Sequence, residues 1–223
     1  MIEAVVFDMD GVLFDTERIS CECCFEAAKE LGISITKQAV YGCFGLNGAD
    51  CRVHVMKTME ELYPGGTFPY DAYREKHDLL FDQRLQAGPP LKKGVRELLD
   101  FLQEKKIKMA VASSTRYERV MSNLTCTGLD GYFQKVITGN MVEHSKPQPD
   151  IYWKACDALG VKPQNAAAVE DSPNGIRSAA AAGMVAIMVP DMVEPTPELE
   201  ALIDLKFSSL TDLREYFTVH GWN

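Results

Sequence analysis

Short runs of β-branched, aromatic and alanine residues recur along this chain, separated by longer segments with helical spacing. The first run, residues 4–7, reads Ala-Val-Val-Phe and stops at acidic residues, which is typical of a buried strand. Similar runs follow at residues 107–112, 135–138, 166–169 and 185–189. We therefore predict five strands, of which the alanine-rich fourth has the weakest signal.

Helical patterns lie between these runs from residue 91 to residue 190. Residues 95–105 place four large apolar side chains on one face, and residues 151–159 and 176–182 give two more helices. Ser172 and Pro173 suit the start of the last helix and Gly183 its end. A capping box is expected at residues 115–118. Regular alternation of strands and helices predicts a parallel sheet with right-handed crossovers.

Residues 16–85 break this alternation, because their pattern is helical throughout. We expect helices near residues 17–31, 37–42, 49–62 and 70–86, with Gly and Pro residues closing the segment at residues 88–90. The predicted fold class is α/β, a doubly wound parallel-sheet core with an inserted all-helical cap. The core is assigned to residues 1–15 and 90–223, and the cap to residues 16–89.

Composition narrows the possible partners. The chain has 223 residues and a formal net charge of -9, so long-range repulsion disfavours nucleic acid and anionic membranes as partners. No apolar run reaches the roughly 18–20 residues of a membrane span. The acidic start is unlike a signal peptide, and seven cysteines, an odd number, favour reduced thiols and a cytoplasmic location.

Polar and charged side chains follow the predicted strands. They are Asp8 and Asp10 after the first, Ser113 and Ser114 after the second, Lys146 in the loop after the third, and Glu170 and Asp171 after the fourth. In open α/β sheets ligands bind beyond the carboxyl ends of the strands, so these residues are expected to share one site.

This set of residues suits phosphoryl transfer. Asp8 and Asp171 are the natural carboxylate ligands for Mg²⁺, which binds hard oxygens and often contacts a substrate phosphate. The metal and Lys146 would offset the repulsion between a phosphate and the carboxylates. Ser113 and the backbone N–H groups near Ser114 could hold phosphate oxygens at the start of the following helix.

The first motif, residues 8–16, resembles the first motif of the haloacid dehalogenase superfamily. Ser113, the pair Lys146–Pro147 and the pair Glu170–Asp171 match its second, third and fourth motifs in order and approximate spacing. The resemblance covers residues 1 to about 190. The helical insertion is similar to the cap of the β-phosphoglucomutase and phosphoglycolate phosphatase branch.

The resemblance implies a role for each matched residue. Asp8 would attack phosphorus and form an aspartyl phosphate, and Asp10 would act as general acid and then general base. Asp8, Asp171 and the backbone carbonyl of Asp10 would bind Mg²⁺, with Glu170 as a further ligand or as a partner of a metal-bound water. Thr16 occupies the place of a hydroxyl near Asp10. The cap would close over the site and select the substrate.

Substrate contacts are expected in the cap, around residues 45–50, where Gly45 and Asn47 are candidates. The mutases of this branch carry a histidine and an arginine at the positions of Ser20 and Gly48, so only Arg52 could reach a second phosphate. A phosphatase acting on a small phosphorylated metabolite is therefore favoured, as a monomer or weak homodimer. A β-phosphoglucomutase-type mutase and a non-catalytic phosphate-binding protein remain alternatives.

Two groups of residues suggest a metal but lack the spacing for one. Cys21, Cys23 and Cys24 have no partner pair at a zinc-like distance along the chain, so we expect them to pack within a helix. None of the four histidines is paired at ligand spacing, although His144 lies close enough to Lys146 in sequence to touch the site.

Overall fold

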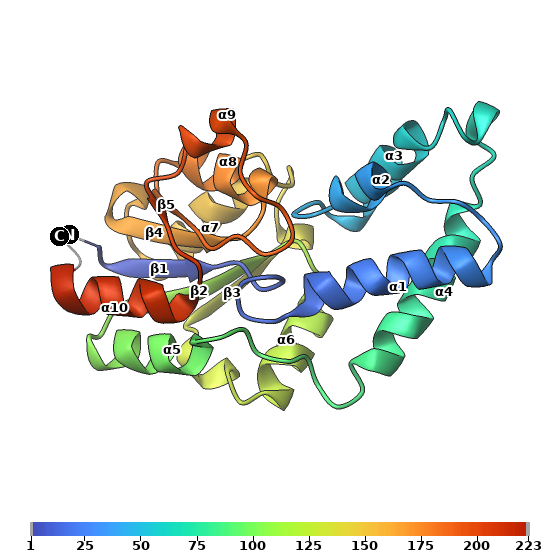
Figure 1. Ribbon diagram of the computed structural model, residues 1–223. Helices are drawn as coiled ribbons and strands as arrows, with labels where there is room; N and C mark the ends of the chain where they lie inside the picture. The colour runs from blue at the N-terminus through green and yellow to red at the C-terminus, as the bar shows by residue number, and fades with distance from the viewer. Residues whose placement is uncertain (1, 222–223) are drawn as a thin grey trace.

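A six-stranded parallel sheet forms the centre of the molecule (Figure 1). A computed structural model describes residues 2–221; the first residue and the last two, which the sequence assigned to the core, lie outside the described residues. The strand order is β3-β2-β1-β4-β5-β6. The strands are β1 (Ala4–Phe7), β2 (Lys108–Ser113), β3 (Lys135–Thr138), β4 (Ala166–Glu170), β5 (Val185–Met188) and β6 (Leu205–Lys206).

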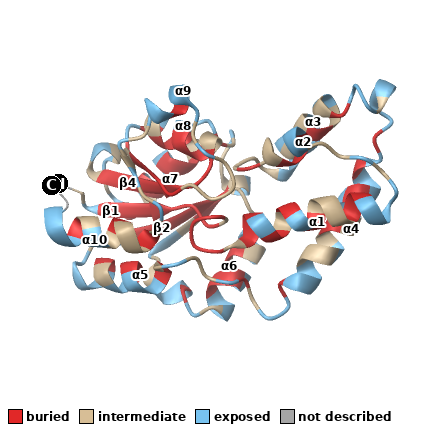
Figure 2. Cartoon of the chain, in the orientation of Figure 1, coloured by how far each residue is buried: buried red, intermediate tan, exposed pale blue. Residues whose placement is uncertain are grey.

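Helices cover both faces of the sheet. One face packs against α5 (Val95–Glu104), α6 (Tyr117–Cys126) and α10 (Leu210–His220); the other packs against α7 (Asp150–Leu159), α8 (Pro173–Ala182) and the short α9 (Pro197–Glu200). Successive side chains of a strand point to opposite faces, so Val5 and Phe7 join the first layer, while Ala4 and Val6 join the second. Figure 2 shows the strands buried between these layers.

The four insertion helices lie beyond the carboxyl ends of the strands. They are α1 (Thr16–Glu30), α2 (Lys37–Tyr41), α3 (Gly48–Thr58) and α4 (Tyr70–Arg84). They share an apolar cluster of their own, centred on Met59, Phe68 and Tyr73. The chain leaves and re-enters the core at adjacent points, since the backbone N–H of Asp15 donates to the carbonyl of Pro90 at 2.9 Å. The predicted α/β core with an inserted helical cap is confirmed.

Several expectations about local structure need correction. β6, α9 and α10 follow residue 190, where no elements were predicted, and α3 ends at Thr58 rather than near residue 62. Four short 3-10 helices occur within residues 2–221: η1 (Pro64–Gly66), η2 (Asp130–Tyr132), η3 (Gly139–Met141) and η4 (Pro163–Asn165). The capping box at residues 115–118 was wrong, because Arg116 is the N-cap of α6 and no side chain caps that helix.

The cysteines also differ from expectation. Cys43 and Cys51 form a disulfide that closes residues 43–51, here called the cap loop. All seven cysteines were expected to be reduced. The free thiols among the described residues are Cys21, Cys23, Cys24, Cys126 and Cys156. Cys21 and Cys23 are buried in α1, as the packing interpretation requires. No helix within residues 2–221 is both long and apolar enough to cross a membrane.

The start of α8 follows the sequence prediction and brings the backbone close to a buried carboxylate. Ser172 is the N-cap, and its hydroxyl accepts a hydrogen bond from the backbone N–H of Gly175 at 3.1 Å. Pro173 occupies the first turn, and Gly183 ends the helix with φ 78°. A Cβ atom on Gly175 would lie only 1.9 Å from the Glu170 carboxyl group. Glycine is therefore required here by space rather than by backbone conformation.

Substitution Gly175→Ala should destabilise the protein by about 1–3 kcal/mol, because the added methyl group forces Glu170 or α8 to move. Urea unfolding monitored by circular dichroism measures the change. Gly131→Ala is the matched control, since no atom lies within 4 Å of its added Cβ, and it should change stability by no more than about 0.5 kcal/mol. Equal stability of the two variants would contradict the close approach at Gly175.

Candidate active site

The candidate site lies where the strand order reverses direction. β1 pairs with β2 on one side and with β4 on the other, so the connections from these strands run to opposite faces of the sheet. A crevice forms beyond the carboxyl ends of strands at such a point. Asp8 directly follows β1, Ser113 ends β2, and Asp171 directly follows β4. The topology therefore brings together residues that are more than 100 positions apart in sequence.

Lys146 is the centre of a buried ionic network. Its ammonium group pairs with Asp8, donates to Glu170 Oε1 at 2.6 Å and donates to the backbone carbonyl of Ala112 at 3.0 Å. All three Lys146 protons thus have acceptors, although the side chain is only 1% exposed. The Lys146–Pro147 peptide bond is cis. Tyr152 donates its hydroxyl to the same Glu170 oxygen at 2.5 Å and fixes that carboxylate from α7.

Burial has the largest effect on the pKa values of this network. It raises the pKa of Asp8 to about 7, although Lys146 opposes the shift. It also raises the pKa of Asp171 well above the usual range, and the charges of Glu170 and Asp8 add to that effect. The pKa of Lys146 is raised as well: burial alone would lower it, but Asp8 and Glu170 outweigh burial. Burial therefore opposes the ionisation of both Asp8 and Asp171 when no further cation is present.

The acidic residues fit a divalent cation. Asp8, Glu170 and Asp171 each offer a carboxylate oxygen, and these atoms lie within 4.8 Å of one another. Gly11, with φ 81°, lets the chain after β1 pass close to Asp171, because a Cβ at this position would lie 2.2 Å from Asp171 Oδ2. Mg²⁺ prefers hard oxygen ligands, and this compact cluster of carboxylates supplies them. The predicted metal residues are therefore brought together.

Asp10 is held by hydroxyl groups from two directions. Thr16 in α1 donates to Oδ1 at 2.6 Å, and Thr115 at the end of β2 donates to Oδ2 at 2.8 Å. The hydroxyl of Thr16 near Asp10 was expected from the sequence. Thr115 was missed because it was assigned to a capping box, and only the parallel pairing of β1 with β2 places it beside Asp10.

The two serines after β2 have different surroundings. Ser113 is 1% exposed, and its hydroxyl accepts a hydrogen bond from the backbone N–H of Thr115 at 3.1 Å. Ser114 donates its hydroxyl to the carbonyl of Gly45 in the cap at 2.9 Å. Asn174 of α8 similarly donates to the carbonyl of Phe44 at 3.1 Å. The cap loop therefore contacts the core directly at the edge of the site.

A cavity of about 720 Å³ separates the cap from the core and includes Asp8, Asp10, Ser113 and Asp171 in its wall. This volume falls within the range typical of small-molecule sites. Of the predicted substrate contacts in the cap, Gly45 and Arg52 line the cavity, whereas Asn47 caps α3 and accepts a hydrogen bond from the backbone N–H of Asp50 at 2.9 Å.

The family model for haloacid dehalogenase-like hydrolases matches residues 5–189. The chain belongs to this family. It is 33% identical over 183 residues to the phosphorylated carbohydrates phosphatase of Thermotoga maritima, and the match covers 82% of each protein. It is 27% identical to hexitol phosphatase B of Escherichia coli, over 95% of this chain and 94% of that protein.

Solved structures of other haloacid dehalogenase-type proteins share the whole fold. A variant of CbbY from Rhodobacter sphaeroides in complex with xylulose-(1,5)bisphosphate has a TM-score of 0.77 at 27% identity, covering 96% of each chain. A β-phosphoglucomutase from Clostridium difficile has a TM-score of 0.81 at 21% identity, covering 100% of this chain and 98% of that one. The family and branch that the motifs predicted are confirmed.

Residues that motif reading missed surround the family's site. Glu17 and His77 line the main cavity from α1 and α4. His77 is 2% exposed, stacks on Phe81 and lies 3.0 Å from the hydroxyl of Ser20. No periodic or motif signal distinguishes this histidine from an ordinary cap core residue. By contrast, His144 is exposed and is not part of the cavity wall. Its Nδ1 atom lies 2.9 Å from Asp150 Oδ1.

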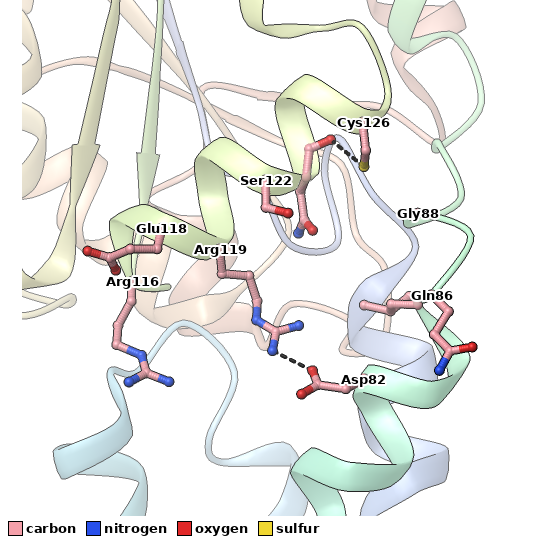
Figure 3. Close-up of a pocket in the computed structure, with 10 residues that line it drawn as sticks. Asp82, Gln86, Gly88, Arg116, Glu118, Arg119, Ser122 and Cys126 are labelled. Carbon is pink, nitrogen blue, oxygen red and sulfur yellow. Dashed lines mark hydrogen bonds and ion pairs between the residues drawn. The ribbon is translucent and has the colours of Figure 1, made fainter.

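A second hollow, of about 700 Å³, lies beside the chain that returns from cap to core (Figure 3). Arg116 and Arg119 extend into it from the first turn of α6, and Arg119 pairs with Asp82 of α4. Both arginines also line the main cavity. Arg52 is already paired with Asp71 within the cap and packs over Tyr70 at 4.8 Å.

Substitution Lys146→Met should destabilise the metal-free protein by about 3–5 kcal/mol at pH 8, because Asp8 and Glu170 lose their buried counter-charge. The loss should shrink toward pH 5. Asp8 has a pKa near 7, so at pH 5 it is protonated and no longer needs Lys146 as a counter-charge. Urea unfolding in EDTA at the two pH values measures both effects. Lys93→Met, at an exposed position, should stay within about 0.5 kcal/mol of the wild type, and a similar result for Lys146→Met would refute the network.

Proposed function

We propose that this protein is a Mg²⁺-dependent phosphatase that hydrolyses a small phosphomonoester, a sugar phosphate or related metabolite, through an aspartyl phosphate on Asp8. The observation that carries the proposal is the position of Asp10. Its carboxylate is fixed by Thr16 and Thr115 at the mouth of the cavity that Asp8 enters. A protein that only bound phosphate would not need a second, oriented carboxyl group there.

Each step assigns a defined task to the chain's own residues. Asp8 forms a bond to phosphorus as the bond to the leaving alcohol breaks, and Asp10 donates a proton to that alcohol. Asp10 then takes a proton from water, whose oxygen bonds to phosphorus and releases Asp8 and inorganic phosphate. Ser113 and Lys146 bind the transferring group. Asp8, Asp171 and the Asp10 carbonyl would hold Mg²⁺, with Glu170 as a further ligand or as a partner of a metal-bound water. The ion would stabilise the negative charge of the transferring phosphoryl group.

The proposed substrate class rests on the relatives and on the cap. The named relatives act on phosphorylated carbohydrates and hexitol phosphates, and the cavity is large enough for a sugar phosphate. We assign residues 16–89 to the cap, which would exclude bulk water and select the substrate, and residues 1–15 and 90–223 to the core. The net charge of -9 supports a small metabolite rather than nucleic acid as partner.

A mutase is the second candidate, because the solved relatives include a β-phosphoglucomutase. Isomerisation would require residues that bind a second phosphate group. The cap offers Arg52, but that guanidinium is paired with Asp71, and Ser20 and Gly48 replace the histidine and arginine of the mutases. Arg74 and Arg119 also line the cavity, but they are paired with Asp78 and Asp82. Arg116 of the core is a further base in the cavity wall. These features favour hydrolysis.

Wild-type protein should release phosphate from sugar phosphates in the presence of Mg²⁺ but not of EDTA. Asp8→Asn should abolish release, and Asp10→Asn should lower kcat by about 10²–10⁴-fold, the usual contribution of a positioned acid–base group. A phosphate assay over a panel of hexose, hexitol and pentose phosphates measures these rates. Asp130→Asn, at an exposed position, should retain full activity.

Two other outcomes would change the assignment. Interconversion of sugar phosphates that depends on a bisphosphate primer, with little phosphate release, would replace the phosphatase by the mutase. Phosphate release that persists in Asp8→Asn would refute the covalent mechanism for both activities.

A further inference from the structure

Asp171 belongs to two overlapping groups of carboxylates. The first, with Asp8 and Glu170, is the proposed metal site. The second joins Asp171 to Glu17 and Asp191, whose carboxylate oxygens also lie within 4.8 Å of one another. Neither Glu17 nor Asp191 belongs to the motifs that define the site. The second group therefore extends the acidic cluster to α1 and to the segment after β5.

Two oxygens of this second group have no protein partner. Glu17 is only 8% exposed, and its Oε2 atom is buried without a hydrogen-bond partner anywhere in the described chain. Asp191 Oδ2 is likewise buried without a hydrogen-bond partner in the described chain, whereas Asp191 Oδ1 accepts a hydrogen bond from Lys92 at 2.6 Å. An unmet buried carboxylate oxygen is costly, so each points to a donor that the chain itself does not supply.

A helix-dipole role does not explain Glu17. Acidic residues in the first turn of a helix are favourable when they remain hydrated at the surface. Glu17 instead lines the cavity and faces Asp171, where a cation or its bound water between the two carboxyl groups would offset their mutual repulsion. Mg²⁺ retains several water molecules in proteins, and outer carboxylates commonly orient such waters.

We propose that Glu17 and Asp191 accept hydrogen bonds from water molecules bound to the Mg²⁺ on Asp171, so that Glu17 couples the cap to the metal. This inference rests on the magnesium site of the proposed function. Glu17 is the second residue of cap helix α1, whereas Asp171 and Asp191 follow core strands β4 and β5. A hydrated metal at Asp171 would thus add a link between cap and core, besides the two chain connections near residues 15 and 85–91 and the direct contacts of Ser114 and Asn174 with the cap.

Lys92 links the second cap–core connection, near residues 85–91, to the carboxylates of this group. It follows Leu91, which forms an antiparallel bridge with Phe14 of the first connection, and its ammonium group binds Asp191. Metal loading should therefore restrain both connections at once. Glu17 and Asp191 are positioning residues in this scheme, since neither contacts the reacting phosphoryl group.

Isothermal titration calorimetry with Mg²⁺ alone tests the first part of the proposal. Glu17→Gln and Asp191→Asn should each weaken Mg²⁺ binding by about 10–100-fold, as loss of an outer-shell partner typically does. Asp171→Asn should abolish binding. Glu61→Gln, an exposed carboxylate-to-amide change in the cap, should bind Mg²⁺ as the wild type does. Wild-type affinity in Glu17→Gln would overturn the inference.

Limited trypsin digestion tests the coupling to the cap without measuring activity. Mg²⁺ should slow cleavage after Arg84 and Lys92 at least several-fold in the wild type and in Glu61→Gln, because proteolysis reports the population of open forms. Glu17→Gln should lose this protection at Mg²⁺ concentrations that saturate its metal site. Protection equal to the wild type at saturation would overturn the coupling.

The failures are distinguishable. If the wild type hydrolyses sugar phosphates with Mg²⁺ but Glu17→Gln matches it in affinity and protection, only this inference fails. If the wild type does not bind Mg²⁺ at all, the magnesium site of the proposed function fails with it.

Discussion

The burial of Lys146 between Asp8 and Glu170 is the constraint on which the site depends. Ion pairs taken out of water are stable only when every charge and hydrogen-bonding group is satisfied. Here the ammonium group has three acceptors, and Tyr152 and Ser172 both contact the carboxylate of Glu170. The remaining carboxyls exceed the available positive charge. Burial, together with the repulsion between the carboxylates, raises the pKa values of Asp8 and Asp171, and a divalent cation would supply the missing positive charge.

Close packing of backbone around these charges is what makes the arrangement possible. The central strand β4 is Ala-Ala-Ala-Val-Glu and wholly buried, so α7 and α8 approach the sheet closely on that side. Gly11 and Gly175 leave room for the carboxylates of Asp171 and Glu170. Small residues in the sheet, at the turn after β1 and at the start of α8 therefore act together to bring helix and strand ends close to one another. A larger side chain at Gly11 or Gly175 would displace a carboxylate.

The sequence predicted the parts of this structure that depend on local pattern and on family motifs. Strand β1, the start of α8 at Ser172 and the meeting of Asp8, Lys146 and Asp171 were all expected. Thr115 was missed because its contact is tertiary: it reads as a helix cap until β1 and β2 are paired. Asn47 differs, because its hydrogen bond with Asp50 is local and caps α3. The two-residue strand β6 has no period long enough to detect.

The cap is held to the core by contacts of a kind that can be broken and remade. Ser114 and Asn174 donate to carbonyls of the cap loop, Ser145 contacts Asp50, and Arg119 pairs with Asp82. Beside these polar contacts lies a small apolar cluster, in which Met192 and Val193 of the core pack against the cap residues Cys21, Val40 and Phe44. Polar contacts that water can replace cost little to open. In the same arrangement Thr16 and Glu17 of α1 lie beside the acid–base residue Asp10 and the metal residue Asp171, which offers a physical route from cap closure to an assembled site.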